Sequence, residues 1–210
     1  MNSPTPATVF VVDDDADVRE AMQRLLKTVG LHGEVFASAR DFLQRSLPQG
    51  PSCLILDIRL PEMSGLEVQQ KLVDAGARIP VIFITAHPDV PLAVKAMKSG
   101  AVEFLTKPFR GQDLVDAVQQ ALARDEAISR ERSDVTVLQE RYRMLTARER
   151  EVMGLITSGM HTKKIGSTLG MSEVTVAVHR GHLMRKMHAD SPAELGRMAE
   201  KLNLPQSKYN

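Results

Sequence analysis

Residues 53–57 read Cys-Leu-Ile-Leu-Asp, a continuous apolar run that ends in a carboxylate. A strand that is apolar at every position is typical of a parallel sheet whose two faces are both covered by helices. The same pattern recurs at residues 9–12 and 80–84, and residues 34–36 and 103–105 are shorter strand candidates. Apolar residues at helical spacing separate these runs. The sequence therefore predicts an α/β fold, a doubly wound five-stranded parallel sheet.

Polar side chains follow four of these runs, at the edge of the sheet where ligands bind in open α/β folds. They are Asp13 and Asp14, Asp57, Thr85, and Lys107. Three carboxylates in one crevice repel each other unless a cation joins them, and Mg²⁺ suits carboxylates together with retained waters. A hydroxyl and an ammonium group beside the metal would bind an anion. This set predicts the transfer of a phosphoryl group to an aspartate.

The motifs around these residues resemble the receiver domain of bacterial two-component response regulators, over residues 8–124. They are Val-Val-Asp-Asp-Asp (11–15), Leu-Ile-Leu-Asp-Ile-Arg-Leu-Pro-Glu-Met-Ser-Gly (54–65), Ile-Thr-Ala-His (84–87) and Phe-Leu-Thr-Lys-Pro-Phe (104–109). The resemblance implies a flavodoxin-like fold. Because the chain has no glycine-rich phosphate-binding loop, the phosphoryl group is expected from a phosphohistidine on a sensor histidine kinase.

The resemblance also assigns a role to individual residues. It implies that Asp57 is the phosphoacceptor and that Thr85 and Lys107 contact the phosphoryl oxygens. It implies that Mg²⁺ (or Mn²⁺) is bound by Asp13 through water, by Asp14 and Asp57 directly, and by the backbone carbonyl of Arg59. Thr85 and Phe104 are the implied switch residues, and Lys107-Pro108 is the implied cis peptide bond.

Residues 146–210 are predicted to be all-helical. Thr146-Ala-Arg-Glu149 is a capping box, and Ser191-Pro192 is a helix start. Two short helices that begin near Thr162 and Glu173 and meet at residues 169–172 predict a helix-turn-helix. Several motifs resemble the LuxR-type DNA-binding domain over residues 142–205: Leu-Thr-Ala-Arg-Glu-Arg-Glu-Val (145–152), Lys163, Ile165, Leu169, Ser172, Thr175-Val176, His179 and Lys186-Met187. Receiver and helix-turn-helix together resemble the NarL/FixJ group, and FixJ-like regulators most.

The second helix of this motif is expected to enter the major groove of DNA. Val176, Leu183 and Met187 are predicted to face inward. Lysine is common in the family at the positions of Ala177 and Gly181, so two expected DNA contacts are absent here, whereas Val178 could contact a thymine methyl group. The predicted DNA-contact residues are Lys163, Lys164, Thr175, Val178, His179, Arg180, His182 and Arg185.

Residues 125–141 are predicted to be a helical linker. Apolar residues form a short heptad-like stripe there, at Ile128, Val135, Leu138, Tyr142 and Leu145. Two heptads are too few to distinguish a seam that pairs between subunits from a solvated connector with a few apolar residues. Both interpretations stay open from the sequence alone.

Composition excludes several protein classes. The single cysteine, Cys53, excludes a disulfide framework and a Cys-rich zinc site, and no apolar run reaches the roughly 20 residues that span a bilayer. No signal peptide is visible. Residues 1–124 carry 15 acidic and 13 basic side chains, whereas residues 146–210 carry 6 and 10. We therefore expect a cytoplasmic protein without a membrane partner, whose tail suits a polyanion.

Together these features predict a response regulator, in which phosphorylation of an aspartate switches dimerisation and sequence-specific DNA binding to regulate transcription. The expected partners are DNA, a sensor histidine kinase and a second copy of the chain, with RNA polymerase as a further candidate. The chain is expected to lose its own phosphoryl group slowly and not to be an enzyme with an external substrate. Two alternatives are a Mg²⁺-dependent phosphatase and an interaction protein whose tail has lost DNA binding.

Overall fold

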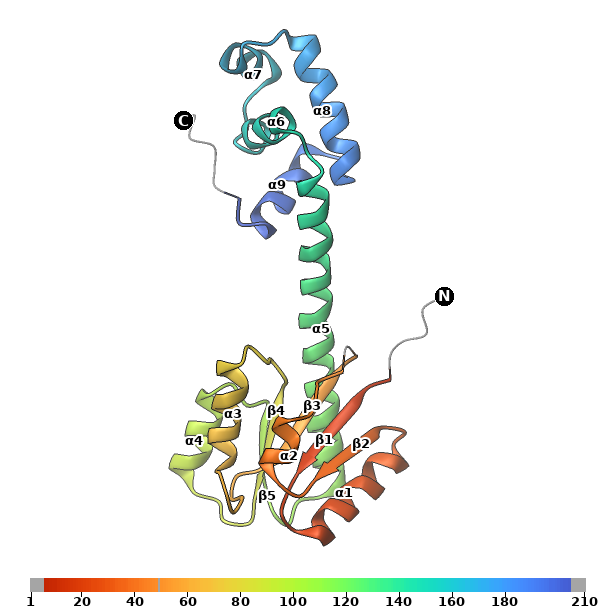
Figure 1. Ribbon diagram of the computed structural model, residues 1–210, viewed down its shortest axis with the longest axis vertical. Helices are drawn as coiled ribbons and strands as arrows, with labels where there is room; N and C mark the ends of the chain where they lie inside the picture. The colour runs from red at the N-terminus through yellow and green to blue at the C-terminus, as the bar shows by residue number, and fades with distance from the viewer. Residues whose placement is uncertain (1–5, 49, 205–210) are drawn as a thin grey trace. The chain divides into compact units, whose positions relative to one another are not determined.

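Strand β3 (Ser52–Asp57) lies at the centre of a five-stranded sheet in the computed structural model, which describes residues 6–48 and 50–204. The other strands are β1 (Thr8–Val12), β2 (His32–Phe36), β4 (Val81–Thr85) and β5 (Glu103–Thr106). Their order is β2-β1-β3-β4-β5, and all neighbouring strands are parallel (Figure 1). The doubly wound sheet that the sequence predicts is confirmed.

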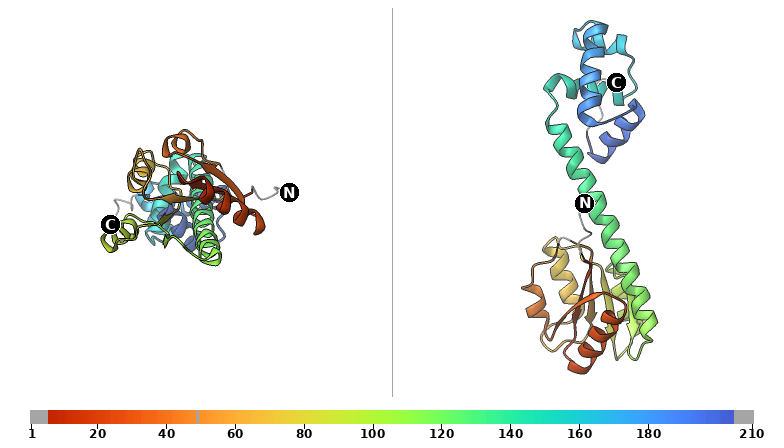
Figure 2. Two further views of the ribbon diagram at one scale, coloured as in Figure 1. Left: turned by 90° about the horizontal axis from the view of Figure 1, so that it is seen from below. Right: turned by 90° about the vertical axis from the view of Figure 1, so that its right-hand side faces the viewer.

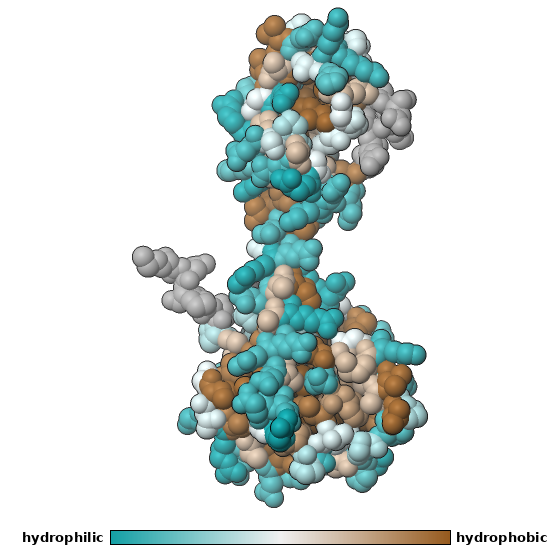
Figure 3. Space-filling view, turned by 180° about the vertical axis from the view of Figure 1, so that it is seen from behind, coloured by the Kyte–Doolittle hydropathy of each residue, from teal (hydrophilic) through white to brown (hydrophobic). Residues whose placement is uncertain are grey.

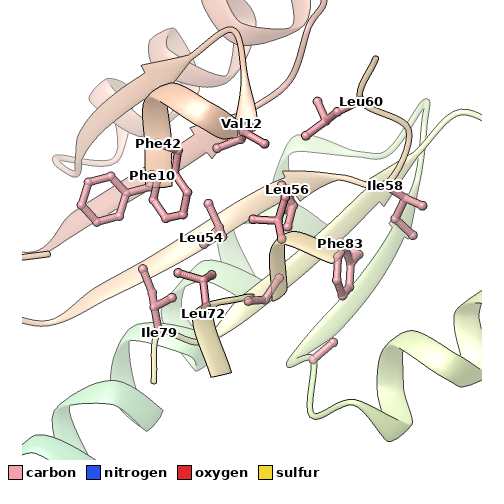
Figure 4. Close-up of a cluster of buried hydrophobic side chains, with 14 of the residues drawn as sticks. Phe10, Val12, Phe42, Leu54, Leu56, Ile58, Leu60, Leu72, Ile79 and Phe83 are labelled. Carbon is pink, nitrogen blue, oxygen red and sulfur yellow. The ribbon is translucent and has the colours of Figure 1, made fainter. Parts of the chain in front are cut away.

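Helices cover both faces of this sheet. On one face lie α1 (Ala16–Thr28) and the first part of α5 (Gly111–Arg143), and on the other lie α2 (Ala39–Leu43), α3 (Gly65–Asp74) and α4 (Val90–Lys98). The right-hand view of Figure 2 shows α3 and α5 on opposite faces. Phe10 and Val12 pack toward α2 and α3 (Figure 4), whereas Val9 and Val11 pack toward α1 and α5. This alternation explains why each residue of β1 is buried.

The chain divides into two units between Ser129 and Arg130. The second unit contains the end of α5 and four more helices, α6 (Ala147–Thr157), α7 (Thr162–Leu169), α8 (Glu173–Met187) and α9 (Pro192–Lys201). Its own core includes Val152, Leu155, Leu183 and Leu195. The all-helical composition predicted for residues 146–210 is confirmed for residues 146–204, and residues 205–210 lie outside the described residues.

Side-chain caps fix the starts of α6, α8 and α9. Thr146 and Glu149 form the predicted capping box of α6, because the Glu149 N–H donates to Thr146 Oγ1 and the Thr146 N–H donates to Glu149 Oε2 at 2.7 Å. Ser172 and Ser191 accept the equivalent N–H groups of α8 and α9. Each cap pairs a donor that would otherwise have no partner in the first helical turn.

The apolar stripe of the predicted linker is mostly core. Leu138 and Leu145 are 7% and 3% exposed in the core of the second unit, and Tyr142 packs against the same cluster. Only Ile128 and Val135 remain outside this cluster, and both are half-buried. A pairing seam between subunits would therefore have two residues of the stripe rather than five.

Two further sequence features have a structural counterpart. Cys53 is buried, and burial raises the pKa of its thiol to about 12, so it is a packing residue rather than a nucleophile. Within the described ranges, none of the helices combines the length and the apolar character that a membrane span requires.

Candidate functional site

The predicted acidic residues meet at the carboxyl edge of the sheet. Val12 of β1 is paired with Leu56 of β3, so the residues that follow them, Asp13 and Asp57, emerge side by side. Asp13 is fully buried and Asp57 is 6% exposed, whereas Asp14 is exposed. One carboxylate oxygen of each of the three lies within 4.8 Å of the others. The parallel register therefore brings Asp13 and Asp57 together, and Asp14 completes the predicted cluster from the loop after β1.

Lys107, which directly follows β5, contacts this acidic cluster. Its ammonium donates to Asp13 Oδ2 at 2.6 Å and to Asp57 Oδ2 at 2.5 Å. Its backbone N–H donates to the carbonyl of Thr85 at 2.7 Å, which fixes the loop after β5 against the end of β4. The Lys107-Pro108 peptide bond is cis, as the resemblance implied. The ammonium thus lies where an anion bound at Asp57 would carry its charge.

Burial and hydrogen bonding act in opposite directions on these two charged groups. For Asp13, burial raises the pKa of the carboxyl above its usual value, although the hydrogen bond from Lys107 works against this. For Lys107, burial alone would lower the pKa of the amine, but the hydrogen bonds to Asp13 and Asp57 outweigh it and the pKa is raised. Lys107 is therefore a cation at neutral pH.

The donor set of this cluster fits a hard divalent cation. Carboxylate oxygens are the ligands that Mg²⁺ and Mn²⁺ take, usually beside several retained waters. Because Asp14 is exposed, the cluster has an open side for such waters. Asp57 Oδ1 also accepts the N–H of Arg59 at 2.8 Å, which fixes the backbone whose carbonyl is the predicted fourth ligand.

Thr85 and Phe104, the predicted switch residues, lie on the adjacent strands β4 and β5, where Thr85 ends β4 and Phe104 is paired with Phe83. Thr85 is fully buried, and its hydroxyl oxygen accepts the N–H of His87 at 3.2 Å. Phe104 is half-buried and packs against the core on the α4 side of the sheet. The two residues therefore lie on neighbouring strands, and their switch role stays a prediction.

In the second unit, α7 and α8 form a tight helix-turn-helix. Gly170 ends α7 with a φ of 67°, a left-handed conformation that favours glycine. At Gly166 a Cβ atom would lie 2.7 Å from the carbonyl oxygen of Met171, so only glycine permits this approach of α7 to the turn. Gly166 is not predictable from the sequence, because nothing in the spacing shows which carbonyl lies next to it.

Helix α8 has a buried face and an open face. Val176, Leu183 and Met187 are fully buried, as predicted. Val174 and Val178 are 75% and 50% exposed. A Cβ atom at the exposed Gly181 would meet nothing within 4 Å. Val174, Val178 and Gly181 therefore form a stripe of small, apolar residues on the exposed side of α8.

The predicted DNA-contact residues differ in their solvent exposure. The exposed ones are Lys163, Lys164, Thr175, Val178, His182 and Arg185. His179 and Arg180 are half-buried, and Arg180 lines a hollow of about 230 Å³ together with Ile156, His161 and Pro192. Arg180 is thus one turn from the buried Val176, on the inner side of α8.

Comparisons with known proteins agree with both halves of this description. Residues 9–119 match the response regulator receiver domain, and residues 143–199 match the LuxR family of bacterial regulatory proteins. The chain is 41% identical to the transcriptional regulatory protein FixJ of Azorhizobium caulinodans, over 93% of each chain. The chain is a response regulator of the NarL/FixJ group.

Two other relatives cover nearly the whole response regulator. Nodulation protein W of Bradyrhizobium diazoefficiens is 46% identical over 95% of this chain and 88% of its own length. The solved structure of the response regulator StyR is 44% identical, with a TM-score of 0.84 over 94% of this chain and 100% of that one. The matched family regions lie inside the predicted domains 8–124 and 142–205, whose outer bounds and the linker 125–141 stay predictions.

Several contacts that stabilise this response regulator are not marked by any sequence motif. Arg19 donates to two backbone carbonyls beside the acidic cluster, and Lys186 pairs with Glu149 between α8 and α6. Arg141 of α5 donates to the carbonyl of Met187 at the end of α8. Their partners are backbone oxygens or residues far away in the chain, so no local motif marks them.

Proposed function

We propose that Asp57 of this response regulator accepts a phosphoryl group from a phosphohistidine of a sensor histidine kinase, and that this controls DNA binding and transcription. The observation that carries the proposal is the geometry around Lys107. Its ammonium contacts both Asp13 and Asp57, at the edge where three carboxylates meet. Such a group compensates the negative charge that a phosphoryl group brings to an aspartate.

In the proposed reaction an oxygen of the Asp57 carboxylate forms a bond to phosphorus while the phosphorus–nitrogen bond of the phosphohistidine breaks. The imidazole leaves with the electron pair and takes up a proton from water. Lys107 and the hydroxyl of Thr85 hold the transferred oxygens. Asp13, Asp14, Asp57 and the carbonyl of Arg59 would hold Mg²⁺ or Mn²⁺, which when bound neutralises charge on the phosphoryl oxygens.

Phosphorylation is proposed to bias an equilibrium between two states rather than to create a new fold. Thr85 turns toward the phosphoryl oxygens, and Phe104 moves into the space that this leaves. The altered surface of α4 and β5 then pairs two copies of the chain. A dimer reads two half-sites and doubles the number of phosphate contacts. The phosphoryl group is lost slowly to water, and no external substrate is turned over.

DNA binding is assigned mainly to charge on α7 and α8. The proposed contact residues are Lys163, Lys164, Thr175, Val178, His179, Arg180, His182 and Arg185. Since Ala177 and Gly181 offer no side chain that could form a hydrogen bond to a base, most of the affinity is expected from the DNA backbone. The cytoplasm is the proposed location, and RNA polymerase is a proposed further partner once two copies are bound to DNA.

Replacement of the phosphoacceptor tests the first part of this proposal. Asp57→Asn should abolish the acid-labile, Mg²⁺-dependent label that the chain takes up from acetyl phosphate, because an amide oxygen is a poor nucleophile. Asp74→Asn, at an exposed carboxylate at the end of α3, should leave the label unchanged. Labelling of Asp57→Asn at the rate of the parent chain would contradict the assignment.

Salt dependence tests the DNA-binding part. Each phosphate that a basic side chain neutralises makes the logarithm of affinity fall by about 0.9 per unit of log salt concentration. Lys163→Ala should therefore weaken binding to all sequences alike and reduce this slope by about one unit. Lys71→Ala, in the first unit, should change neither. If Lys163→Ala weakened only the preferred site at an unchanged slope, Lys163 would be a base reader instead.

A further inference from the structure

Arg19 of α1 holds the loop that carries two of the proposed metal ligands. Its Nη1 atom donates to the backbone carbonyl of Asp13 and to that of Asp14, both at 2.8 Å. The side chain is half-buried against the end of β1. A single guanidinium nitrogen therefore bridges two consecutive peptide groups at the point where the chain leaves the sheet.

The carboxylate of Asp14 depends on this backbone for its direction. Asp13 is fixed in other ways, since its Oδ1 accepts the N–H of Asp15 at 3.0 Å and its Oδ2 accepts from Lys107. The side chain of Asp14 has no hydrogen bond or ion pair to any residue in the part of the chain that the structure describes. Only the path of its own backbone aims it at Asp57.

The local charge makes a backbone tie necessary. Four of the five residues from 13 to 17 are aspartates, and like charges at this spacing repel each other. Arg19 places a permanent positive charge behind the loop, and it bonds to carbonyls rather than to carboxylates, so the carboxylate oxygens stay available to a cation. An arginine at this place thus counters the repulsion without competing for the metal ligands.

We propose that Arg19 is a positioning residue for the divalent cation, acting through the backbone of Asp13 and Asp14. The inference rests on the proposed function, because it concerns the cation that phosphorylation of Asp57 requires. Partners behind a metal ligand commonly change metal affinity by about 10–100-fold when they are removed. Arg19 therefore belongs to the site although it touches neither the cation nor the phosphoryl group.

The test measures Mg²⁺ binding directly, by calorimetry on the full chain without a phosphodonor. Arg19→Met keeps the stem but removes both hydrogen bonds, and should raise the dissociation constant for Mg²⁺ about tenfold. Arg19→Lys, which keeps the positive charge on a shorter side chain, should fall between this variant and the parent. Arg24→Met is the matched control, because Arg24 lies on the same helix and its side chain pairs only with the exposed Glu20 in the described chain. It should bind Mg²⁺ like the parent.

Labelling by acetyl phosphate as a function of Mg²⁺ concentration gives a second readout. Arg19→Met should shift the half-saturating concentration by the same factor and leave the maximal rate near that of the parent. A general loss of folding would instead lower the maximal labelling rate. It would also impair both Mg²⁺ binding and labelling in Arg19→Lys. An unchanged Mg²⁺ dissociation constant in Arg19→Met would overturn the inference while the proposed function stands. A parent chain that binds Mg²⁺ but takes up no label would refute the proposed function instead.

Discussion

Glu149 shows how a single buried charge can join two helices. It is 2% exposed, and its carboxylate accepts the N–H of Thr146 and the ammonium of Lys186, each at 2.7 Å. Burial raises the pKa of this carboxyl, but the hydrogen bonds from Lys186 and Thr146 outweigh burial, and the pKa lies below its usual value. The carboxylate is thus ionised at neutral pH and connects the start of α6 to the end of α8.

This ion pair predicts how the stability of the second unit depends on pH. Glu149→Gln should lower the free energy of unfolding at pH 7 by about 1–3 kcal/mol, because it removes charged hydrogen bonds at a buried position. The folded-state pKa is lower than the unfolded value near 4.5, so the stabilisation is present above that pH and is lost as the pH falls through the folded pKa. Urea unfolding between pH 7 and pH 3 measures it.

The control for this prediction is Glu151→Gln. Glu151 pairs with Arg148 on the same helix, but both side chains are about half exposed, so the change should be small at every pH. A difference between the parent and Glu149→Gln that stayed constant down to pH 3 would show that lost packing, not lost charge, is responsible.

The residues predictable from the sequence are those that end an apolar run. Asp13 directly follows the buried strand β1, Asp57 and Thr85 are the last residues of β3 and β4, and parallel strands end at one edge. Arg19 and Gly166 could not be found in this way, because their role depends on carbonyl groups that the fold brings near them. Sequence patterns show which side chains a strand delivers, but not which backbone atoms face a given residue.

At the scale of elements, the sequence predicts the bounds of strands that are apolar on both faces better than the bounds of edge strands. The predicted run at 34–36 lies within β2, which begins at His32, because the polar residues at the start of this edge strand break the apolar pattern. The stripe from Ile128 to Leu145 was ambiguous for another reason. Over two heptads a core-facing stripe and a coiled-coil seam have the same spacing, and the structure places most of the stripe in a core.

The turn between α7 and α8 carries an element-scale prediction. Gly166→Ala should destabilise the second unit by about 1–3 kcal/mol, because the added methyl group overlaps the Met171 carbonyl oxygen and α7 must move away. DNA affinity should fall for all sequences alike, since α8 is displaced as a whole. Thermal unfolding and DNA titration measure the two effects.

Gly196→Ala in α9 is the matched control for this substitution. A Cβ atom there meets nothing within 4 Å, so the intrinsic helix propensity of alanine should stabilise the unit by up to about 1 kcal/mol. Equal effects of the two substitutions would mean that α7 adapts freely and that the close approach at Gly166 has no role.

At the scale of the whole molecule, one helix contributes to two separate cores. Leu114 and Val118 of α5 are buried against the sheet, and Leu138 of the same helix is buried in the core of the second unit. In the middle of α5, residues 129–134 are all exposed, and Figure 3 shows mostly hydrophilic residues along this part. The middle of α5 therefore belongs to none of the hydrophobic cores.

Whether phosphorylation changes DNA binding through an unbroken α5 can be tested by interrupting this helix. Glu131→Pro removes one backbone N–H in the exposed middle of the helix and clashes with the carbonyl of residue 127, which costs about 3 kcal/mol in a helix interior. Neither core contains residue 131, so both units should stay folded by circular dichroism and bind Mg²⁺ and DNA as in the parent. What should change is the ratio of DNA affinities with and without acetyl phosphate, which we expect to fall toward one.

Glu131→Ala, which keeps the helix intact, should preserve the parent ratio. If Glu131→Pro preserved it as well, an unbroken α5 would be unnecessary for the switch, and pairing of two receivers at the ends of flexible tethers would suffice to bring their DNA-binding units together.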